Sequence, residues 1–260
     1  MPESGEQFVT LSFFDANLCF GRPIQAVYQP AETAADLQRV MAHNGITKGL
    51  VWHIAQREYA ASEGNRLLAK AIAGRKNLFG CWAILPPQTD EVITPDFFRR
   101  MKTRRIFALR AFPTLHNYII NRVVFGKFLV EVTERRIPLM LSVEKASGGW
   151  PAIYNLLAEF PNLTCIFCDI GIWNSDRFTW PLLENYPNVF LETSLLALED
   201  AGIEETVARY GAERLLFGSN FPERYPEGAM LAIRHAAIPA ADKKKIASSN
   251  LESLMQGAQL

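Results

Sequence analysis

The sequence predicts a single α/β domain of the (β/α)8 barrel class, also called a TIM barrel. Short runs rich in β-branched and aromatic residues recur along the chain, and amphipathic stretches lie between most of them. Eight such units in 260 residues match the size of this barrel, and no linker or internal repeat divides the chain. Residues 1–260 are therefore expected to form one domain, with right-handed crossovers between parallel strands.

Eight runs of strand-forming residues set the order of the predicted sheet. Each is bounded by turn-forming residues or by an amphipathic stretch. The predicted strands are Leu11–Cys19, Ile46–Ile54, Leu78–Leu85, Arg105–Phe112, Ile137–Val143, Leu163–Ile170, Val189–Thr193 and Arg214–Ser219.

The stretches between these runs have the spacing of helices that pack one face on a sheet. Gly45, Gly171 and Gly211 mark element boundaries, and Phe221-Pro222 ends the last unit because proline has no N–H to donate. The predicted helices include Ala34–His43, Asn65–Arg75, Pro95–Lys102, Val123–Arg135, Pro151–Phe160 and Glu204–Tyr210.

An open, doubly wound parallel sheet is the competing fold. Open sheets of this kind that bind nucleotides carry a glycine-rich loop after the first strand, which binds the phosphate groups. The corresponding segment, Phe14–Gly21, contains neither GxGxxG nor GxxxxGK[ST]. The closed barrel is therefore favoured.

The charge balance limits the partners that the chain can bind. Lys+Arg and Asp+Glu both number 27, so the formal net charge is zero. This argues against nucleic acid or a membrane as the main partner, leaves a small molecule as the expected ligand, and is compatible with a homo-oligomer. The N-terminus has neither a basic region nor an apolar core, which predicts no signal peptide and a cytoplasmic location.

Of the four cysteines, only Cys165 and Cys168 have the spacing of a motif. They lie in a predicted strand, where side chains three positions apart point to opposite faces. The CxxC is therefore not expected to form a redox pair or to share a metal ion.

In a barrel of this class, the site is built at the C-terminal ends of the strands. Strand alternation puts Asn17 beside Cys19, and Ser142 beside Glu144, on one face. Asp169 is notable because a carboxylate in an apolar strand needs a cation or hydrogen-bond donors. Glu192, in a Glu-Thr-Ser run, is interpreted as a residue that fixes the loop backbone. The polar residues expected at the strand ends are Asn17, Cys19, His53, Arg110, Ser142, Glu144, Asp169, Glu192 and Asn220.

Several motifs occur in a fixed order along nearly the whole chain. They are Phe14-Asp-Ala-Asn-Leu-Cys19, Arg136-Ile-Pro-Leu-Met-Leu-Ser142, Phe160-Pro-Asn-Leu-Thr-Cys-Ile-Phe-Cys-Asp-Ile-Gly171, Tyr186-Pro-Asn-Val-Phe-Leu-Glu-Thr-Ser194 and Gly211-Ala-Glu-Arg-Leu-Leu-Phe-Gly-Ser-Asn-Phe-Pro222, followed by Asn250. With these motifs the chain resembles the amidohydrolase superfamily, specifically its amidohydrolase-related (amidohydrolase 2) branch. The resemblance implies a barrel enzyme that hydrolyses or decarboxylates small organic acids, lactones and related compounds.

The resemblance also implies a divalent metal ion, Zn, Mn or Fe, which family members hold with histidines and with an aspartate of the eighth strand. The matching positions here are Asn17, Cys19, Ser142, Asp169 and Asn220. Amide and hydroxyl side chains are weak neutral ligands, and an amide cannot accept a proton from water. The sequence therefore predicts a divergent member with a degenerate metal site and no metal cofactor.

Three interpretations follow. The favoured one is a metal-free hydrolase or decarboxylase for a small carboxylate, lactone or amide, with Asp169 or Glu144 as general base and Cys19 as nucleophile. Arg110 or Lys145 would then steer a carboxylate group of the substrate. The residues expected to bind the substrate are Asn17, His53, Arg110, Ser142 and Asn220.

The second interpretation is a pseudoenzyme that binds a small molecule or acts as a partner subunit. The third is a relocated metal site that uses Asp169, Glu144, Cys19 and His53. A carboxylate that faces a cavity beside Arg110 would favour catalysis. Carboxylates locked in salt bridges within a filled mouth would favour a binding or structural role.

Overall fold

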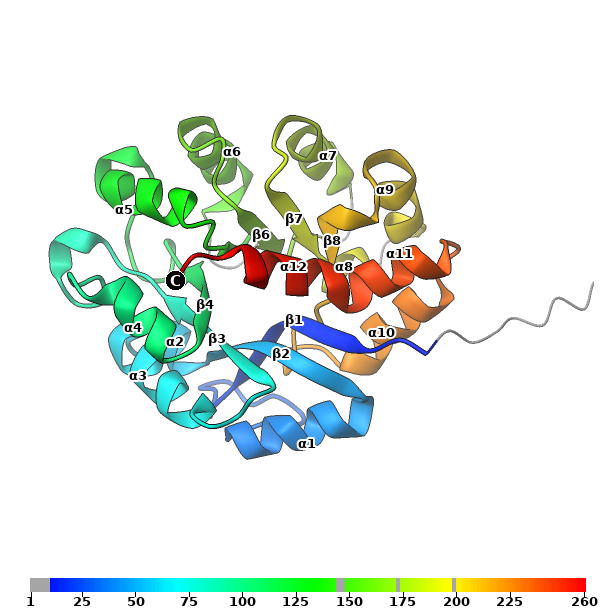
Figure 1. The fold of residues 1–260 in the computed structure, drawn as a ribbon, viewed down its shortest axis with the longest axis horizontal. Coiled ribbons are helices and arrows are strands. Elements are labelled where there is room, and N and C mark those ends of the chain that lie inside the picture. The colour runs from blue at the N-terminus through cyan, green and yellow to red at the C-terminus, as the bar shows by residue number, and fades with distance from the viewer. Residues whose placement is uncertain (1–9, 144–147, 172–173, 198–199) are drawn as a thin grey trace, which may run out of the picture.

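The computed structural model describes residues 10–143, 148–171, 174–197 and 200–260. In them, eight parallel strands form one sheet whose spatial order is the order along the chain, and helices surround the strands (Figure 1). The predicted (β/α)8 barrel is therefore confirmed. The strands are β1 (Phe13–Phe20), β2 (Ile46–His53), β3 (Leu78–Ala83), β4 (Ile106–Ala111), β5 (Leu139–Ser142), β6 (Cys165–Cys168), β7 (Val189–Glu192) and β8 (Leu215–Leu216).

Backbone hydrogen bonds between β1 and the chain after β8 close the barrel. The amide of Ala16 donates to the carbonyl of Phe217 at 2.9 Å, and the amide of Cys19 donates to the carbonyl of Phe221 at 2.9 Å. The ladder between β7 and β8 is therefore shorter than the predicted Arg214–Ser219, because the chain beyond it pairs with β1 instead.

The helices predicted from periodicity correspond to α1, α3, α4, α5, α6 and α9. The structure adds short helices after β2 and β7, a helix between β6 and β7, and three helices at the end of the chain. The helices are α1 (Ala34–Asn44), α2 (Ala55–Glu58), α3 (Ala61–Ile72), α4 (Phe97–Thr103), α5 (Arg122–Glu134), α6 (Gly149–Glu159), α7 (Asp176–Asn185), α8 (Thr193–Leu196), α9 (Gly202–Tyr210), α10 (Pro226–His235), α11 (Ala240–Lys244) and α12 (Asn250–Gly257).

Local sequence signals fix where some of these helices begin and end. Thr33 and Asp36 form a reciprocal capping box at the start of α1, which satisfies N–H groups that have no partner within the helix. Gly45 ends α1 with a φ of 71°, a left-handed conformation that costs glycine little. Asn121 caps α5 by accepting a hydrogen bond from the backbone N–H of Val124.

The last helix covers the N-terminal end of the barrel (Figure 1). Nδ2 of Asn250 donates to the carbonyls of Ala212 and Leu215, both at 2.8 Å, which ties α12 to the start of β8. Lys48 at the start of β2 forms an ion pair with Glu252 of α12 at 2.8 Å. The C-terminal strand ends, which face the other way, are therefore the end at which a site can form.

Alternation along β6 separates the two cysteines of the CxxC. Phe167 faces outward and packs against Trp150 of α6, with ring centroids 6.5 Å apart. Cys165 shares that outward face, whereas Cys168 faces the barrel interior, where the charge of Arg110 reaches it. Both thiols are buried and unbridged, as expected for residues on opposite faces of a strand.

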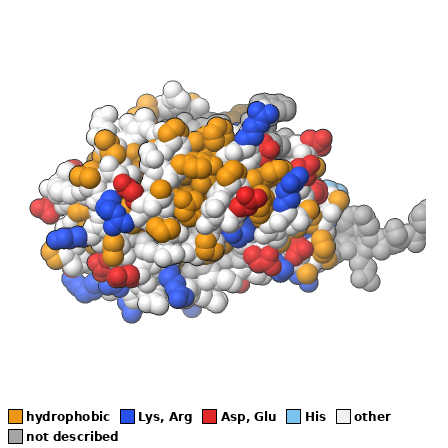
Figure 2. All heavy atoms as spheres, turned by 90° about the horizontal axis from the view of Figure 1, so that it is seen from above, with side chains coloured by type: hydrophobic (Ala, Val, Ile, Leu, Met, Phe, Trp, Pro, Cys, Tyr) orange, Lys and Arg blue, Asp and Glu red, His pale blue; other side chains and the backbone are white. Residues whose placement is uncertain are grey.

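The outer surface over α6 and α7 is partly apolar. Figure 2 looks onto this side from above Figure 1 and shows apolar side chains gathered near its middle, with charged groups around them. Phe178 of α7 is 44% exposed and stacks on Trp150 of α6, with ring centroids 5.1 Å apart. In the described part of the chain, no helix combines the length and hydropathy that a membrane span requires.

Candidate active site

Polar side chains from five strands or strand ends meet in the mouth of the barrel. The structure brings five of the predicted site residues into one hydrogen-bonded network, and each of them is buried. Strand ends position them as the barrel class requires. These residues are Asn17 of β1, Arg110 of β4, Ser142 of β5, Asp169 after β6 and Asn220 after β8.

Asp169 lies at the centre of this network. It follows β6 directly and has a φ of 50°, in the left-handed region that aspartate and asparagine tolerate better than most residues. Oδ1 accepts a hydrogen bond from Nδ2 of Asn220 at 2.8 Å, and Oδ2 accepts one from the hydroxyl of Ser142. The carboxylate is only 4% exposed, and among the described residues its partners are neutral donors and not cations.

Asn17 connects the guanidinium of Arg110 to the carboxylates of the mouth. Oδ1 accepts from Nη1 of Arg110 at 2.9 Å and from Nε1 of Trp52 at 3.3 Å. A guanidinium and an indole N–H can only donate, so they fix which end of the amide faces them. Nδ2 therefore points the other way, where it lies 3.4 Å from Oε2 of Glu192 and 3.4 Å from Oδ1 of Asn220.

The same donor logic orients the rest of the network. Because Oδ1 of Asn220 faces the amide N–H of Asn17, its Nδ2 faces Asp169 and donates to it. A directed series of hydrogen bonds thus runs from Arg110 through two amides to Asp169. The mouth holds a cation and an anion that are connected through these amides.

Arg110 is 2% exposed and retains unused hydrogen-bond donors. Its guanidinium lies 4.6 Å from the ring centroid of Trp52 and 5.6 Å from that of Phe112, and both rings attract its charge. Nε has no hydrogen-bond partner, and no carboxylate of the described residues lies within ion-pair distance. A buried guanidinium with spare donors is suited to binding an anion.

Glu192 is a buried acid that borders the network. Its oxygens accept from the backbone N–H of Ser194 at 2.6 Å and from the Ser194 hydroxyl at 2.8 Å, so it holds the loop backbone as expected. Burial, followed by the negative charge of Asp169, raises the pKa of Glu192 to about 8. Gly218 makes room for it, since a Cβ there would lie 2.3 Å from Oε1. Burial therefore favours the protonated form of Glu192.

Sequence reasoning missed Asp15, which joins β1 to the chain after β8. Oδ1 accepts from the backbone N–H groups of Asn17 at 2.9 Å and Ser219 at 3.1 Å. Oδ2 has no partner among the described residues, and burial raises the pKa of Asp15 to about 6. The signal was present in the sequence, because a carboxylate amid apolar strand residues needs donors in the same way as Asp169.

Cys19 and His53 lie beside the network, and among the described residues they form no hydrogen bond with it. Burial raises the pKa of the Cys19 thiol well above its usual range, so the thiolate that a nucleophile requires is disfavoured. Nδ1 of His53 accepts from the backbone N–H of Ala55 at 3.1 Å, and burial lowers the pKa of the imidazole. The His53 and Phe20 rings pack in a T-shaped arrangement, with ring centroids 5.1 Å apart. Glu144 and Lys145, the other predicted site residues, lie outside the described residues.

The side chains that the structure describes in the mouth do not form a set that fits a divalent metal ion. Among the described residues, no three of His, Cys, Asp and Glu come close enough to hold one. The oxygen of Asn17 already accepts two hydrogen bonds, and one of its donors is the cation of Arg110. Serine and asparagine groups offer no negative charge to balance a metal ion, so within the five-residue network only Asp169 could do so.

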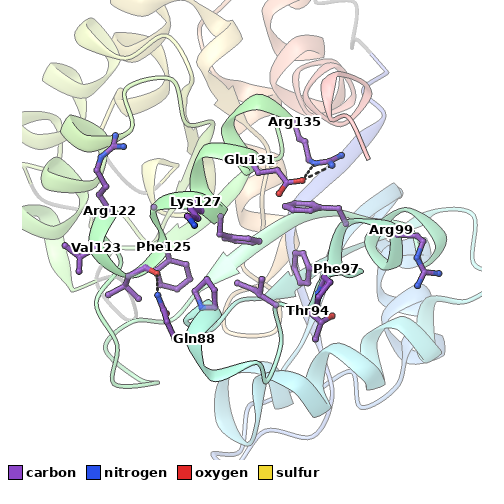
Figure 3. Close-up of a pocket in the computed structure, with 17 residues that line it drawn as sticks. Gln88, Thr94, Phe97, Arg99, Arg122, Val123, Phe125, Lys127, Glu131 and Arg135 are labelled. Carbon is purple, nitrogen blue, oxygen red and sulfur yellow. Dashed lines mark hydrogen bonds and ion pairs between the residues drawn. The ribbon is translucent and has the colours of Figure 1, made fainter.

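A separate open pocket of about 880 Å³ lies outside the barrel between α4 and α5 (Figure 3). Its floor is apolar and includes Phe97 and Phe125. Its charged rim includes Glu131 and Arg135, which neutralise each other in an ion pair at 2.8 Å. The buried ionisable groups of the mouth therefore make the better candidate for chemistry.

The sequence model of the amidohydrolase family matches residues 20–252. The chain belongs to this family. The resemblance predicted from its motifs is thus confirmed. Four of those motifs contain the network residues Asn17, Ser142, Asp169 and Asn220. No functionally curated protein matches the sequence at a significant level.

Solved structures show the same fold at low sequence identity. The 2,6-dihydroxybenzoate decarboxylase from Rhizobium has a TM-score of 0.75 and 16% identity, over 95% of this chain and 99% of that one. A dihydroxybenzoic acid decarboxylase from Polaromonas sp. JS666, solved with bound manganese and 2-nitroresorcinol, has a TM-score of 0.74 and 15% identity, over 95% and 97%. The 4-oxalomesaconate hydratase from Rhodopseudomonas palustris has a TM-score of 0.66 and 14% identity, over 94% and 96%. At these identities the three structures show a shared fold over nearly the whole length of this chain.

Proposed function

We propose that this amidohydrolase family member is a hydrolase or decarboxylase that acts on a small carboxylate, lactone or amide at the barrel mouth, without a metal ion. One observation carries the proposal. A carboxylate, Asp169, and a guanidinium with unused donors, Arg110, share one buried mouth and are joined through amides instead of a direct ion pair. Neither charge is therefore neutralised by a direct ion pair with a described residue.

In this proposal Arg110 binds a carboxylate group of the substrate. Its Nε has no partner among the described residues, so it and the free part of the guanidinium present donors in the planar arrangement that suits a carboxylate. Trp52 and Phe112 hold the guanidinium in place and provide an apolar wall for a small planar ligand. Substrates named for the solved relatives, dihydroxybenzoates among them, belong to this class of small organic acid.

Asp169 acts as the general base. In hydrolysis it takes a proton from water as the water oxygen bonds to the substrate carbonyl carbon, and it returns the proton to the departing group. Ser142 and Asn220 use one acceptor position on each carboxylate oxygen and leave others for the water. Cys19 has no role in this scheme, because the thiol is buried and protonated.

A turnover screen tests the proposal. Protein purified in EDTA is incubated with a panel of small carboxylic acids, lactones and amides, and products are followed by mass spectrometry. Turnover is expected without added metal, and Asp169→Asn is expected to lower it about a hundredfold or more, because a positioned base typically contributes that much. The matched control is Asp90→Asn, which makes the same change at an exposed loop position. Turnover that survives Asp169→Asn, or that depends on added metal, would contradict the proposal.

A pseudoenzyme that binds a small organic acid is the second candidate. It is favoured by the low exposure of Asp169 and by the hydrogen bonds that both of its oxygens already accept. Binding of a panel compound that raises the melting temperature, depends on Arg110 and gives no product would support this function over catalysis.

A further inference from the structure

Arg110 has an unusual setting for a buried cation. Buried guanidinium groups usually pair with a carboxylate, because an isolated charge is costly to remove from water. Within the described residues, Arg110 instead donates to the amide oxygen of Asn17 at 2.9 Å and lies over Trp52 at 4.6 Å. The charge is held by an amide and an aromatic face.

This cation stands at one end of the hydrogen-bonded series in the mouth. Asn17 accepts from Arg110 on one side and approaches Asn220 on the other, and Asn220 donates to Asp169. Every donor in this series points away from the guanidinium and toward the carboxylate. The two amides therefore align their dipoles between a positive and a negative end.

We propose that the guanidinium of Arg110 is the resident positive charge of the barrel mouth, in place of a divalent metal ion, and that it orients Asn17 and Asn220 toward Asp169. This role holds whether or not the mouth is catalytic. Arg110 is thus a positioning residue that would also keep cations out of the site.

Two physical arguments support this assignment. A divalent cation would need the oxygen of Asn17 as a ligand, but two donors already occupy that oxygen. A cation near Asn17 would also lie a few ångströms from the guanidinium, and like charges at such distances repel strongly where water is excluded. Within the described hydrogen-bonded network, Asp169 is the one carboxylate that remains to offset both charges.

Zinc binding to a variant with restored ligands tests whether Arg110 excludes a metal. Asn17→His/Asn220→Asp places an imidazole and a carboxylate beside the existing Cys19 and Asp169, a donor set that suits Zn²⁺. Zn²⁺ affinity, measured by calorimetry, is expected to rise about tenfold or more when Arg110→Met is added to this variant, because the repulsion is removed. Arg209→Met is the matched control, since Arg209 also lies on a tryptophan ring, 4.2 Å from Trp180, but on α9. Equal Zn²⁺ affinity with and without Arg110 would overturn the proposal, as would stoichiometric Zn²⁺ in wild-type protein that Asp169→Asn removes.

A double-mutant cycle tests the link from Arg110 to Asp169 with no metal present. Arg110→Met is measured in wild-type and in Asp169→Asn protein by urea unfolding. The unfolding equilibrium constant is expected to change about tenfold less in the Asp169→Asn background, because the carboxylate that the cation balances is gone. If the Arg110→Met variant folds only when Asp169→Asn is also present, that result would also support the link. Equal effects in both backgrounds would overturn it.

Discussion

At the scale of single residues, burial sets the charge of the mouth. Glu192 has a pKa of about 8 in the folded chain, against an ordinary value of 4.5. Between these values the folded chain holds a proton that the unfolded chain releases. The free energy of unfolding therefore falls as pH rises through this window, by about 1.4 kcal/mol per pH unit at most, and levels off above the folded pKa. Asp15 adds the same sign of effect between its ordinary value of 3.8 and about 6.

The first prediction is that Glu192→Gln flattens this pH dependence above about pH 6. Glutamine keeps an oxygen for the backbone N–H of Ser194. Its NH₂ group can donate to the Ser194 hydroxyl oxygen but cannot accept from Nδ2 of Asn17, 3.4 Å away. Urea midpoints between pH 5 and 9 measure the effect, with the exposed Glu91→Gln as control. If wild-type stability stays level or increases from pH 6 to 8, the assignment of a proton to Glu192 is wrong.

The direction of the hydrogen bonds in this network could not be predicted from the amino-acid sequence. Asn17 was expected at the site from its place at a strand end. The donors that fix its amide, Trp52 and Arg110, lie 35 and 93 positions away in the chain. Such contacts depend on how the barrel closes and on side-chain rotamers. The periodicity of apolar residues in the sequence predicts neither of these. Asp169 could be predicted as a site residue because a carboxylate among apolar strand residues stands out in the sequence. The same reasoning could have identified Asp15.

At the scale of elements, the strands could be predicted because each is marked by the composition of a short stretch of sequence. The closure of the barrel between its last and first strands could not be predicted in this way. β8 is short because the chain from Phe217 onward pairs with β1, about 200 positions earlier. The role of Asn250 was also hidden in the sequence. It ties α12 across the bottom of the barrel through two backbone carbonyls, a long-range contact without a local signature.

The junction between β7 and β8 gives the second prediction. Gly218 follows β8, and a Cβ there would lie 2.3 to 2.5 Å from atoms of the Glu192 side chain, which is buried and bonded to Ser194. Gly218→Ala is therefore expected to lower the free energy of unfolding by about 1–3 kcal/mol, the usual cost of overpacking a core.

Gly228→Ala is the matched control for this change. Gly228 lies within α10, and nothing would contact its Cβ within 4 Å, so alanine is expected to stabilise the helix by about 0.5–1 kcal/mol. Urea unfolding of both variants measures the contrast. A Gly218→Ala protein as stable as wild type would show that Glu192 can move, and would weaken the account of a rigid mouth.

At the scale of the whole molecule, charge and surface predict how the chain behaves in solution. The formal net charge is zero and the sequence pI is about 6.9, so electrostatic repulsion between copies is weakest near neutral pH. The face over α6 and α7 exposes apolar side chains, among them Phe178 stacked on Trp150 (Figure 2). Such a face favours association between copies when repulsion is weak.

The third prediction is that the chain self-associates near pH 7 and less so at pH 5 or 9, where a net charge develops. Sedimentation velocity over a range of protein concentrations measures this. Phe178→Glu is expected to weaken association near pH 7, because it puts a charge into the apolar face. Leu231→Glu, at a similarly exposed apolar position on α10, is the control for the added charge alone. Equal weakening by both variants would assign the effect to net charge and not to this face, and a monomer at every pH would contradict the prediction itself.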